Sequence, residues 1–431
     1  MEQQCGRGGG ISVSSRKELV MNVSTLQKID KWLGVPLCFL LTGCARLRFG
    51  SRRAADAANL RNLLIVKLAE QGSTVLAYPA FLRAVELVGR ENVYCLVFEE
   101  NRFILEIIGM VPAENVLTIS TRNFLSLVGS SLRAFWRLWK LKLDAAIDME
   151  FFTRASAVVT FLSMARRRVG FHSCFGAGPY RGNLMTHRLL YNPHLHATET
   201  FLMMIEALRV NADSLPTFPF RPDPSEKPLP QFVPRQDELA AVKELLGNIP
   251  GWQEGLFVLN PNASDLLPLR RWPNERYVEL ARLLLARHPE CGVVMTGTAT
   301  EAMAIGRLAA EVGSPRCLSV AGKTTLRQLL ALYSLADVLV TNDSGPAHFA
   351  SLTPIHVVTL FGPETPKLFG ARSGRNTSLW AGLACSPCVN AFNNRQSRCR
   401  NNLCMQQITV EQVFAEACRA YEASKQAKRR C

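Results

Sequence analysis

A short polar segment in the C-terminal half of the chain has the composition of an anion site. The sequence DSGPAH (343–348) follows the apolar run ADVLVT (336–341) and begins a stretch with a helical pattern. Free N–H groups at the start of a helix, together with its dipole, bind diphosphates, and a glycine there lets an oxygen approach closely. In the alternative interpretation Asp343, a candidate N-cap residue, and Ser344 only cap a structural helix. The residues assigned to this site are Asp343, Ser344, Gly345, Pro346 and His348.

A second polar loop follows another apolar run, LFVLNP (256–261). It contains the small polar residues Asn260 and Asn262, and it ends in Arg270-Arg271 before Trp-Pro. Pro273 fits the first turn of a helix, and the two arginines are suited to neutralise an anionic ligand above it. The alternative is an exposed arginine pair without a ligand.

Four cysteines crowd into residues 385–404 with the spacing C-x2-C-x10-C-x4-C. Two pairs of thiolates on one loop suit a tetrahedral metal, zinc first and an iron–sulfur centre second. Buried or redox-paired thiols are the alternative. The residues of this cluster are Cys385, Cys388, Cys399 and Cys404.

The elements that must position these residues alternate in a βαβ pattern on both sides of a proline-rich segment. Apolar runs and amphipathic stretches alternate from Leu63 to about residue 165, and again from residue 256 to 362. Seven prolines lie between residues 215 and 235, where they disfavour helix and central strand. We therefore predict an α/β protein with two Rossmann-like domains facing a cleft, with site residues just after the strands. The predicted divisions are an extension (1–59), a first domain (60–213), a linker (214–236) and a second domain (237–431).

Composition restricts the class of protein. The chain has 431 residues, 48% of them hydrophobic and 20% charged, which is typical of a folded globular protein and not of a disordered one. Its net charge of +15 favours an anionic partner. The N-terminus lacks the pattern of a secretory signal, and nine of the 13 cysteines are scattered outside the cluster, so we predict a reducing cytoplasm.

The apolar segment from Trp32 to Ala45 is too short to span a bilayer, and Pro36 interrupts it. Lys28 and Lys31 precede the segment and several arginines follow it. This pattern favours a helix lying in an anionic membrane interface, with packing on the protein body as the alternative.

The order strand, DSGPAH, helix, strand, FGPETP resembles glycosyltransferase family 9, the heptosyltransferases, and the resemblance extends over about residues 60–420. It implies the GT-B arrangement of two Rossmann-like domains. It also implies that Arg270 stands where the family places a phosphate-binding lysine and that Glu301 contacts the sugar of the donor nucleotide. Further residues that we assign to the donor site are Asn260, Asn262, Thr296, Gly297 and Thr324.

The first domain departs from the family at the expected catalytic base. The family usually has an aspartate after the glycine of the opening loop, whereas this chain has Ser73 after Gly72. A serine is too weak an acid to act as a base unaided. Glu70 is one candidate replacement and Asp148 a second, while loss of activity or activation of the acceptor by another group remains open. The candidate catalytic residues are Glu70, Ser73 and Asp148.

The leading hypothesis is an inverting transferase that moves a sugar, heptose first, from a nucleoside-diphosphate donor such as ADP-heptose to a lipopolysaccharide-core or related envelope glycan. Such an enzyme needs no catalytic cofactor, and zinc would be structural only. We expect a cytoplasmic protein in peripheral contact with the inner face of the membrane, with no nucleic-acid partner.

Two alternatives stay open. One is a non-catalytic sugar-nucleotide-binding homologue, which is supported by Ser73 at the position of the usual family aspartate. The other is a zinc-knuckle nucleic-acid-binding protein that uses the basic and aromatic residues of the cysteine loop. The loop-rich stretch with His172, His187, His194 and His196 is interpreted as a surface for an anionic acceptor.

Overall fold

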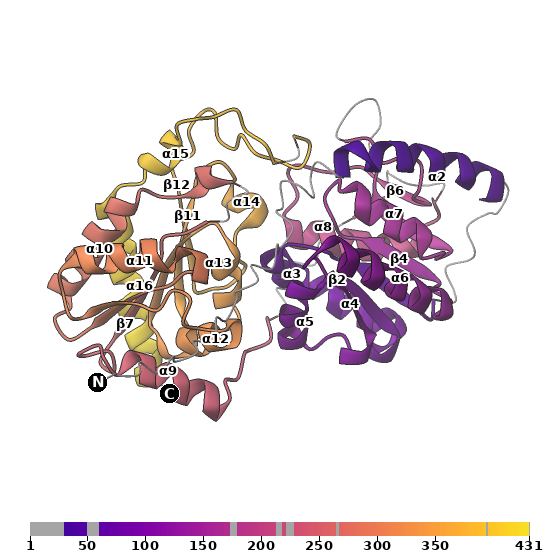
Figure 1. The fold of residues 1–431 in the computed structure, drawn as a ribbon. Helices are drawn as coiled ribbons and strands as arrows, with labels where there is room; N and C mark the ends of the chain where they lie inside the picture. Colours follow the sequence, from indigo (N-terminus) through magenta and orange to yellow (C-terminus); the bar gives the residue numbers. More distant parts are fainter. Residues whose placement is uncertain are drawn as a thin grey trace, which may run out of the picture.

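The computed structural model describes residues 30–49, 60–172, 179–212, 218–220, 228–263, 267–393 and 395–430, without the side chains of 46–49. The remaining parts of the predicted extension and linker lie outside the described residues. The chain forms two parallel six-stranded sheets, each covered by helices, with α2 on the outside of the first (Figure 1). The predicted α/β fold with two Rossmann-like halves is confirmed.

The N-terminal sheet has the strand order β3-β2-β1-β4-β5-β6, and every pairing is parallel. All residues of β1, β4 and β5 are buried, as expected for a sheet covered on both faces, although β4 ends in Asp148 and β5 begins with Arg167 and Arg168. The strands are β1 (Leu63–Val66), β2 (Val93–Phe98), β3 (Val116–Ile119), β4 (Ala145–Asp148), β5 (Arg167–Phe171) and β6 (His187–Leu189).

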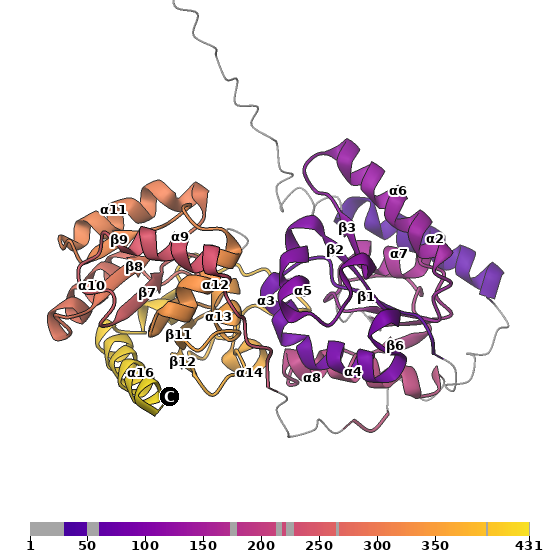
Figure 2. The same ribbon diagram turned by 90° about the horizontal axis from the view of Figure 1, so that it is seen from below.

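Helices cover both faces of this sheet. Figure 2 shows α6, α7 and α2 on one side and α4 and α8 on the other. The amphipathic stretches of the sequence predict helices near 79–89, 101–109 and 153–165, which correspond to α4, α5 and α7, whereas α6 and α8 were not predicted. The helices of this half are α2 (Gly34–Phe49), α3 (Gln71–Leu76), α4 (Tyr78–Val88), α5 (Arg102–Ile108), α6 (Phe124–Lys140), α7 (Arg154–Leu162) and α8 (Ala197–Glu206), with 3-10 turns at Arg90–Asn92, Glu99–Asn101, Ala113–Asn115 and Ala207–Arg209.

The C-terminal sheet has the order β12-β11-β10-β7-β8-β9, which is the same winding as in the first sheet when each is counted from its own first strand. Five of its strands agree with the predicted runs between residues 256 and 362, and the edge strand β12 was not predicted. They are β7 (Leu256–Asn260), β8 (Gly292–Met295), β9 (Cys317–Ser319), β10 (Val338–Asn342), β11 (His356–Phe361) and β12 (Asn376–Trp380).

The sequence predicts a C-terminal helix near 409–424, because Thr409 followed by Gln412 has the pattern of a capping box, and helix α16 begins there. Thr409 and Gln412 exchange the two reciprocal bonds of a capping box, 3.0 and 3.3 Å long. The helix runs to Arg430, beyond the predicted end. The helices of this half are α9 (Gln236–Leu246), α10 (Asn274–Arg287), α11 (Ala302–Val312), α12 (Leu326–Leu335), α13 (Gly345–Ala350), α14 (Pro366–Phe369), α15 (Leu403–Gln406) and α16 (Val410–Arg430), with 3-10 turns at Pro268–Arg270 and Ala299–Glu301.

The segment 32–45 lies mostly in α2. This helix packs on α7 through Cys38 and Leu41, while Phe39 and Leu40 remain exposed. Among the described residues, no helix is long and apolar enough to cross a membrane. Packing on the protein body is therefore observed for one side of α2, and a membrane contact of its other side stays a prediction.

Candidate functional site

The predicted site residues follow the two central strands of each sheet. In the C-terminal sheet, β7 and β10 are parallel neighbours, and the winding of the sheet reverses between them. Asn262 follows β7, and Asp343 and Ser344 follow β10. Ligands of open α/β sheets bind at this switch point, beyond the carboxyl ends of the strands.

The start of α13 differs from the prediction. Ser344, not Asp343, is the N-cap residue, and its side chain makes no capping bond but donates to the backbone oxygen of Asn342 at 3.1 Å. The helix has only six residues, Pro346 has no N–H, and the amide of Ala347 already donates to Ser344. The backbone thus offers few free donors here, and side chains must supply most of the contacts to any anion.

Unpartnered polar groups gather around this turn. Five of the eight buried side-chain atoms that lack a hydrogen-bond partner within the described residues lie here. A buried polar group without a partner costs about 1–3 kcal/mol, so a cluster of them indicates a place where a ligand completes the bonding. The atoms are Asn262 Nδ2, Arg270 Nε, His348 Nδ1, Asp343 Oδ2 and Glu364 Oε1.

Arg270 faces two carboxyl groups in this cluster. Its guanidinium nitrogen lies 3.7 Å from Asp343 Oδ2 and 3.8 Å from Glu364 Oε2. Burial, reinforced by the neighbouring Glu364, raises the pKa of Asp343 well above its ordinary range, although Arg270 opposes the shift. This shift favours the neutral form of Asp343, which leaves more of the Arg270 charge for a ligand.

His348 is buried and neutral. Burial lowers its pKa to about 4, and the nearby charge of Arg270 acts in the same direction. The N-terminal half approaches the ring closely, because a Cβ at Gly72 would lie 2.7 Å from His348 Cδ2. Glycine at this position therefore lets the loop after β1 contact the start of α13 and brings the two halves together.

Glu70 lies on that loop, as the residue before α3, with a positive φ of 64°. Its carboxylate forms an ion pair with Arg395, and Ser73 donates to it at 3.3 Å and to the backbone oxygen of Glu70 at 2.9 Å. Burial alone would raise the pKa of Glu70, but Arg395, Lys67 and Arg270 together lower it below its usual value. Glu70 is therefore ionised, and Ser73 orients it.

Asp148 is arranged differently. It is fully buried at the end of β4, where it pairs with Arg181 and accepts hydrogen bonds from Ser156 at 3.1 Å and from the backbone N–H of Glu150 at 3.1 Å. Burial raises its pKa in spite of Arg181. The Asp148 side chain is 0% exposed, whereas that of Glu70 is 34% exposed, so the geometry favours Glu70 over Asp148 as the group that meets a substrate.

The cysteine loop crosses from the C-terminal half to the N-terminal half (Figure 1). Phe392 packs against Phe152 and Tyr191, with ring centroids 5.8 and 5.2 Å apart. Arg395 pairs with Glu70 and lies over the ring of Phe369. Two of the side chains that the nucleic-acid hypothesis needs at the surface, Phe392 and Arg395, are therefore engaged within the molecule, whereas Arg398 and Arg400 are exposed.

The four cysteines of this loop do not converge in this arrangement. Among the described residues, the only three potential ligands with atoms within 4.8 Å of one another are His288, Glu290 and Cys291. Cys404 is buried, Cys388 is half-buried, and Cys385 and Cys399 are exposed. The geometry does not fit a tetrahedral zinc site, and the zinc prediction stays a prediction that metal analysis of the purified protein can check.

The other predicted donor residues line the switch point. Asn260 donates to Thr296 at 3.0 Å, so these two side chains partner each other. Gly297 leaves room for Asn262, whose amide nitrogen would lie 2.8 Å from a Cβ there.

Glu301 and Thr324 lie at the starts of helices. One oxygen of Glu301 forms a capping box with Thr298, which gives this carboxylate a structural role in the described residues. Thr324 precedes the N-cap residue of α12. A contact of either residue with a nucleotide stays a prediction.

Two of the four histidines in the histidine-rich stretch lie inside the protein. His187 lies in β6 and His196 caps α8, both buried, and burial lowers the pKa of each to about 4. His196 also bonds to the backbone oxygen of Gly370 at 3.0 Å. The prediction of a surface for an anion is wrong for these two residues, because histidine composition does not distinguish a basic surface from neutral rings packed inside, while His172 is half-buried and His194 is exposed.

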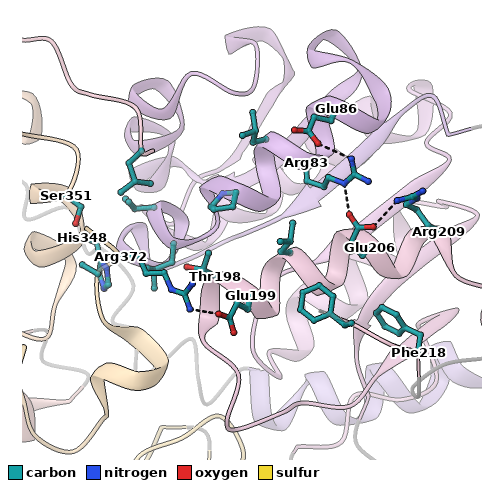
Figure 3. Close-up of a pocket in the computed structure, with 18 of the residues that line it drawn as sticks. Arg83, Glu86, Thr198, Glu199, Glu206, Arg209, Phe218, His348, Ser351 and Arg372 are labelled. Atoms are coloured by element: carbon teal, nitrogen blue, oxygen red, sulfur yellow. Dashed lines mark hydrogen bonds and ion pairs between the residues drawn. The ribbon is translucent and has the colours of Figure 1, made fainter. Parts of the chain in front are cut away.

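A cavity of about 660 Å³ lies between α4, α8 and the start of α13 (Figure 3). Its wall includes His348 but none of Asn262, Arg270 or Glu70. The arginines that line it are paired with glutamates: Arg83 and Arg209 with Glu206, and Arg372 with Glu199. The cavity is thus balanced in charge and adjoins the anion site without being that site.

Three residues of the site were missed from the sequence. Glu364 lies in FGPETP just after β11, so the rule that site residues follow strands pointed to it. Glu150, which accepts bonds from Lys67 at 3.1 Å and the Ala69 amide at 2.9 Å, likewise follows β4. Arg395 had no local signal, because its partner Glu70 lies 325 residues away.

Comparison with known proteins gives consistent matches. The family model described as glycosyltransferase family 9 (heptosyltransferase) matches residues 132–397, more than half of the chain. Lipopolysaccharide heptosyltransferase 2 of Escherichia coli K12 is 28% identical over 224 residues, 49% of this chain and 58% of the relative. The same-named protein of Salmonella typhimurium is 32% identical over 131 residues, 30% of this chain and 34% of the relative. The aligned segments thus cover between a third and three fifths of these relatives.

Solved structures share the whole fold. The structure of E. coli ADP-heptose LPS heptosyltransferase II has a TM-score of 0.63 at 18% identity and covers 84% of this chain and 99% of its own. A family 9 glycosyltransferase from Veillonella parvula has a TM-score of 0.65 at 17% identity, with 86% and 99% covered. At these identities the likeness shows the fold, two Rossmann-like halves in the GT-B arrangement.

Proposed function

Because the chain belongs to glycosyltransferase family 9, we propose that it transfers a sugar from a nucleoside-diphosphate donor to a glycan of the lipopolysaccharide core or a related envelope glycan. Heptose carried on ADP is the first candidate, since the relatives above are named heptosyltransferases. The observation that carries the proposal is the cluster of buried, unpartnered polar atoms around Arg270 at the switch point of the C-terminal sheet.

In this proposal the donor diphosphate lies between Arg270, Asn262 and the start of α13. Arg270 supplies positive charge, Asn262 a free amide N–H, and neutral His348 a hydrogen bond that does not depend on protonation near pH 7. When the bond to the sugar breaks, negative charge grows on the leaving diphosphate. Donors already held in place at that point stabilise this charge, and such preorganisation is often the main source of an enzyme's rate enhancement.

Glu70 is the proposed base. The acceptor hydroxyl oxygen forms a bond to the anomeric carbon, the bond from that carbon to the diphosphate oxygen breaks, and the hydroxyl proton passes to the Glu70 carboxylate. The low pKa of Glu70 keeps it ready to accept a proton, and Ser73 fixes its orientation. The ion pair with Arg395 must loosen when an acceptor binds, because it occupies the same carboxylate.

That ion pair also supports a second candidate, a sugar-nucleotide-binding protein without transferase activity. Ser73 replaces the usual family aspartate, and the one carboxylate near it is neutralised by Arg395. If Arg395 does not release Glu70, the donor site would bind a nucleotide sugar but no acceptor would be deprotonated.

The proposal also covers where the protein acts and which surface it contacts. A glycan acceptor of the envelope is carried on lipid, so the protein would act at the inner face of the cytoplasmic membrane as a peripheral protein. The net charge of +15 suits an anionic lipid surface of this kind.

A nucleotide-release assay separates these possibilities. The protein is incubated with ADP-, UDP- and GDP-linked sugars, with and without a heptose-free lipopolysaccharide core acceptor, and binding of each nucleotide is measured in parallel. Release that requires the acceptor supports the transferase. Binding without release supports the second candidate, and absence of binding to all three would overturn the donor site.

A further inference from the structure

Helix α6 exposes an apolar stripe along its whole length. The stripe residues recur three or four positions apart, at 125, 128, 132, 136 and 139, so they share one face of the helix. Their side chains are 40–82% exposed. We call this set the α6 stripe: Leu125, Val128, Leu132, Trp136 and Trp139.

The stripe is additional to the face that α6 buries. Ala134 and Leu138, on the opposite side, pack into the core beneath the sheet. An amphipathic helix normally turns its apolar residues to the core and its polar residues to water. Contiguous exposed apolar patches of this kind are rare on monomeric proteins and mark contact surfaces.

Helix α2 adds to the same side of the molecule. It lies on α7, which shares with α6 one side of the N-terminal sheet (Figure 2). Its exposed side chains include Phe39 and Leu40, and Trp32 and Leu33 just before it are also exposed. Two helices of this half thus present large apolar side chains that the described part of the chain leaves uncovered.

Positive charge borders the α6 stripe. The sequence from 120 to 143 contains no acidic residue, whereas Arg133, Arg137 and Lys140 form a neighbouring face of the helix. The Lys140 ammonium lies 3.4 Å above the ring of Trp136. Exposed tryptophans beside lysines and arginines are the composition of a surface that enters the interface of an anionic bilayer. A second copy of the chain would bring like charges together at this rim.

We propose that the α6 stripe, with the exposed side of α2, docks the protein on an anionic lipid bilayer. The position of α6 in the fold suits the proposed function. The purpose of the docking rests on that proposed function. Helix α6 starts beyond the carboxyl end of β3, the edge of the parallel sheet at which Glu70 also lies. A bilayer on α6 would therefore lie beside the cleft, where a lipid-linked acceptor must enter.

Vesicle flotation tests the docking without any nucleotide. The purified protein is mixed with vesicles of phosphatidylcholine alone or of phosphatidylcholine with phosphatidylglycerol. We expect binding to the anionic vesicles, and a loss of about tenfold or more in the double variant Leu125→Glu, Leu132→Glu, because two apolar side chains are removed from the bilayer contact and two negative charges are added. Met303→Glu, a change of an equally exposed apolar residue on α11, is the matched control and should bind as the wild type does.

A separate variant tests the charged rim of the stripe, formed by Arg133, Arg137 and Lys140. Arg133→Gln should weaken binding to anionic vesicles about fivefold, as expected for one basic residue near such a surface, and added salt should weaken the wild type in the same direction. Lys243→Gln, an exposed lysine of α9, is the control. Equal effects of the two substitutions would show that only net charge acts and would overturn the assignment of this rim.

Three results would overturn the docking surface itself: no binding of the wild type to anionic vesicles, unchanged binding of the leucine variant, or a wild-type dimer that the leucine variant separates. Melting temperature confirms that the variant is folded. Nucleotide binding in solution is measured separately. If vesicles bind and nucleotides do not, the proposed function fails and the docking surface stands.

Discussion

The two sheets are wound in the same order, yet the polar side chains after their central strands differ in whether they have partners within the protein. After β1 and β4, charges are paired within the protein: Lys67 with Glu150, and Arg181 with Asp148. After β7 and β10, Asn262 and Arg270 have atoms without partners. One fold thus places a completed network at one switch point and an incomplete one at the other.

The difference shows where a ligand is needed. A buried pair that is already satisfied stabilises the loop that contains it and has little to offer a substrate, whereas buried donors without partners gain most from an anion. Glu70 stands between these cases, because its partner Arg395 comes from the other half of the molecule. In the proposed function the paired side supplies a scaffold, and the unpaired side supplies binding.

The strongest way to break this comparison is Glu70→Gln. If Glu70 is the base, the rate of acceptor-dependent nucleotide release should fall about 1,000-fold, within the range for removal of a general base, while nucleotide affinity changes little. Glu99→Gln, an exposed glutamate of the same half paired with Arg122, is the control. Full activity of Glu70→Gln would remove Glu70 from the mechanism.

Arg270→Gln tests the incomplete side. Loss of a fixed charged donor at the leaving diphosphate should lower kcat/KM about 100-fold. Arg271→Gln is the matched neighbour, since its guanidinium donates to the backbone oxygen of Ala263 at 3.0 Å. Steady-state kinetics on both variants give the ratio, and similar losses in the two would contradict a specific role for Arg270.

Arg395→Gln tests the ion pair between Glu70 and Arg395, which joins the two halves of the molecule. Without the guanidinium, the pKa of Glu70 should rise towards or above its ordinary value, because burial is then less opposed. The acid limb of kcat/KM should move to higher pH, and the rate near neutral pH should change about tenfold or less. A pH profile identical to that of the wild type would show that Arg395 does not control Glu70.

Ser73→Ala removes one neutral hydrogen bond to Glu70. Such a bond contributes roughly 0.5–1.5 kcal/mol, so activity should fall about two- to tenfold. Ser351→Ala, at a buried serine that bonds only to the backbone of its own helix in the described structure, provides the comparison. A loss as large as that of Glu70→Gln would instead make Ser73 part of the proton path.

His348→Gln should change how the free energy of unfolding depends on pH. The folded pKa of His348 is about 4 and its ordinary value is 6.5, so the unfolded state binds more protons between these values. Stability from this residue is present above pH 6.5 and is lost as the pH falls to about 4. The variant should unfold with a pH dependence smaller by up to one proton in this window, measured by denaturant titration, and an unchanged slope would contradict a neutral buried ring.

Apolar runs predicted the central strands of both sheets, because fully buried strands such as β7 and β10 are mostly apolar. The strands β5, β6 and β12 were not predicted, because their sequences RRVGF, HRL and NTSLW contain polar residues. The same approach missed α6, whose stripe faces outward, so its pattern did not suggest a core helix. Boundaries within the linker remain a prediction, because residues 213–217 and 221–227 lie outside the described part.

The site could be predicted in part, for a physical reason. Asn262, Arg270, Asp343 and His348 are close in space because parallel strands end at one edge, which a sequence pattern reveals. The pair of Arg395 with Glu70 depends on how the cysteine loop crosses between the halves, and composition does not encode that path. Nor could composition show that His187 and His196 are buried, or that Asp148 is paired with Arg181.

The most direct test is equilibrium binding of ADP, UDP and GDP to the wild type, Arg270→Gln and Arg271→Gln, measured by calorimetry. We expect one nucleoside diphosphate to bind the wild type and Arg271→Gln alike and to bind Arg270→Gln about 100-fold more weakly, as for a buried charged contact. Binding that Arg270→Gln leaves unchanged, or no binding of any of the three, would contradict a donor site at the unpaired switch point.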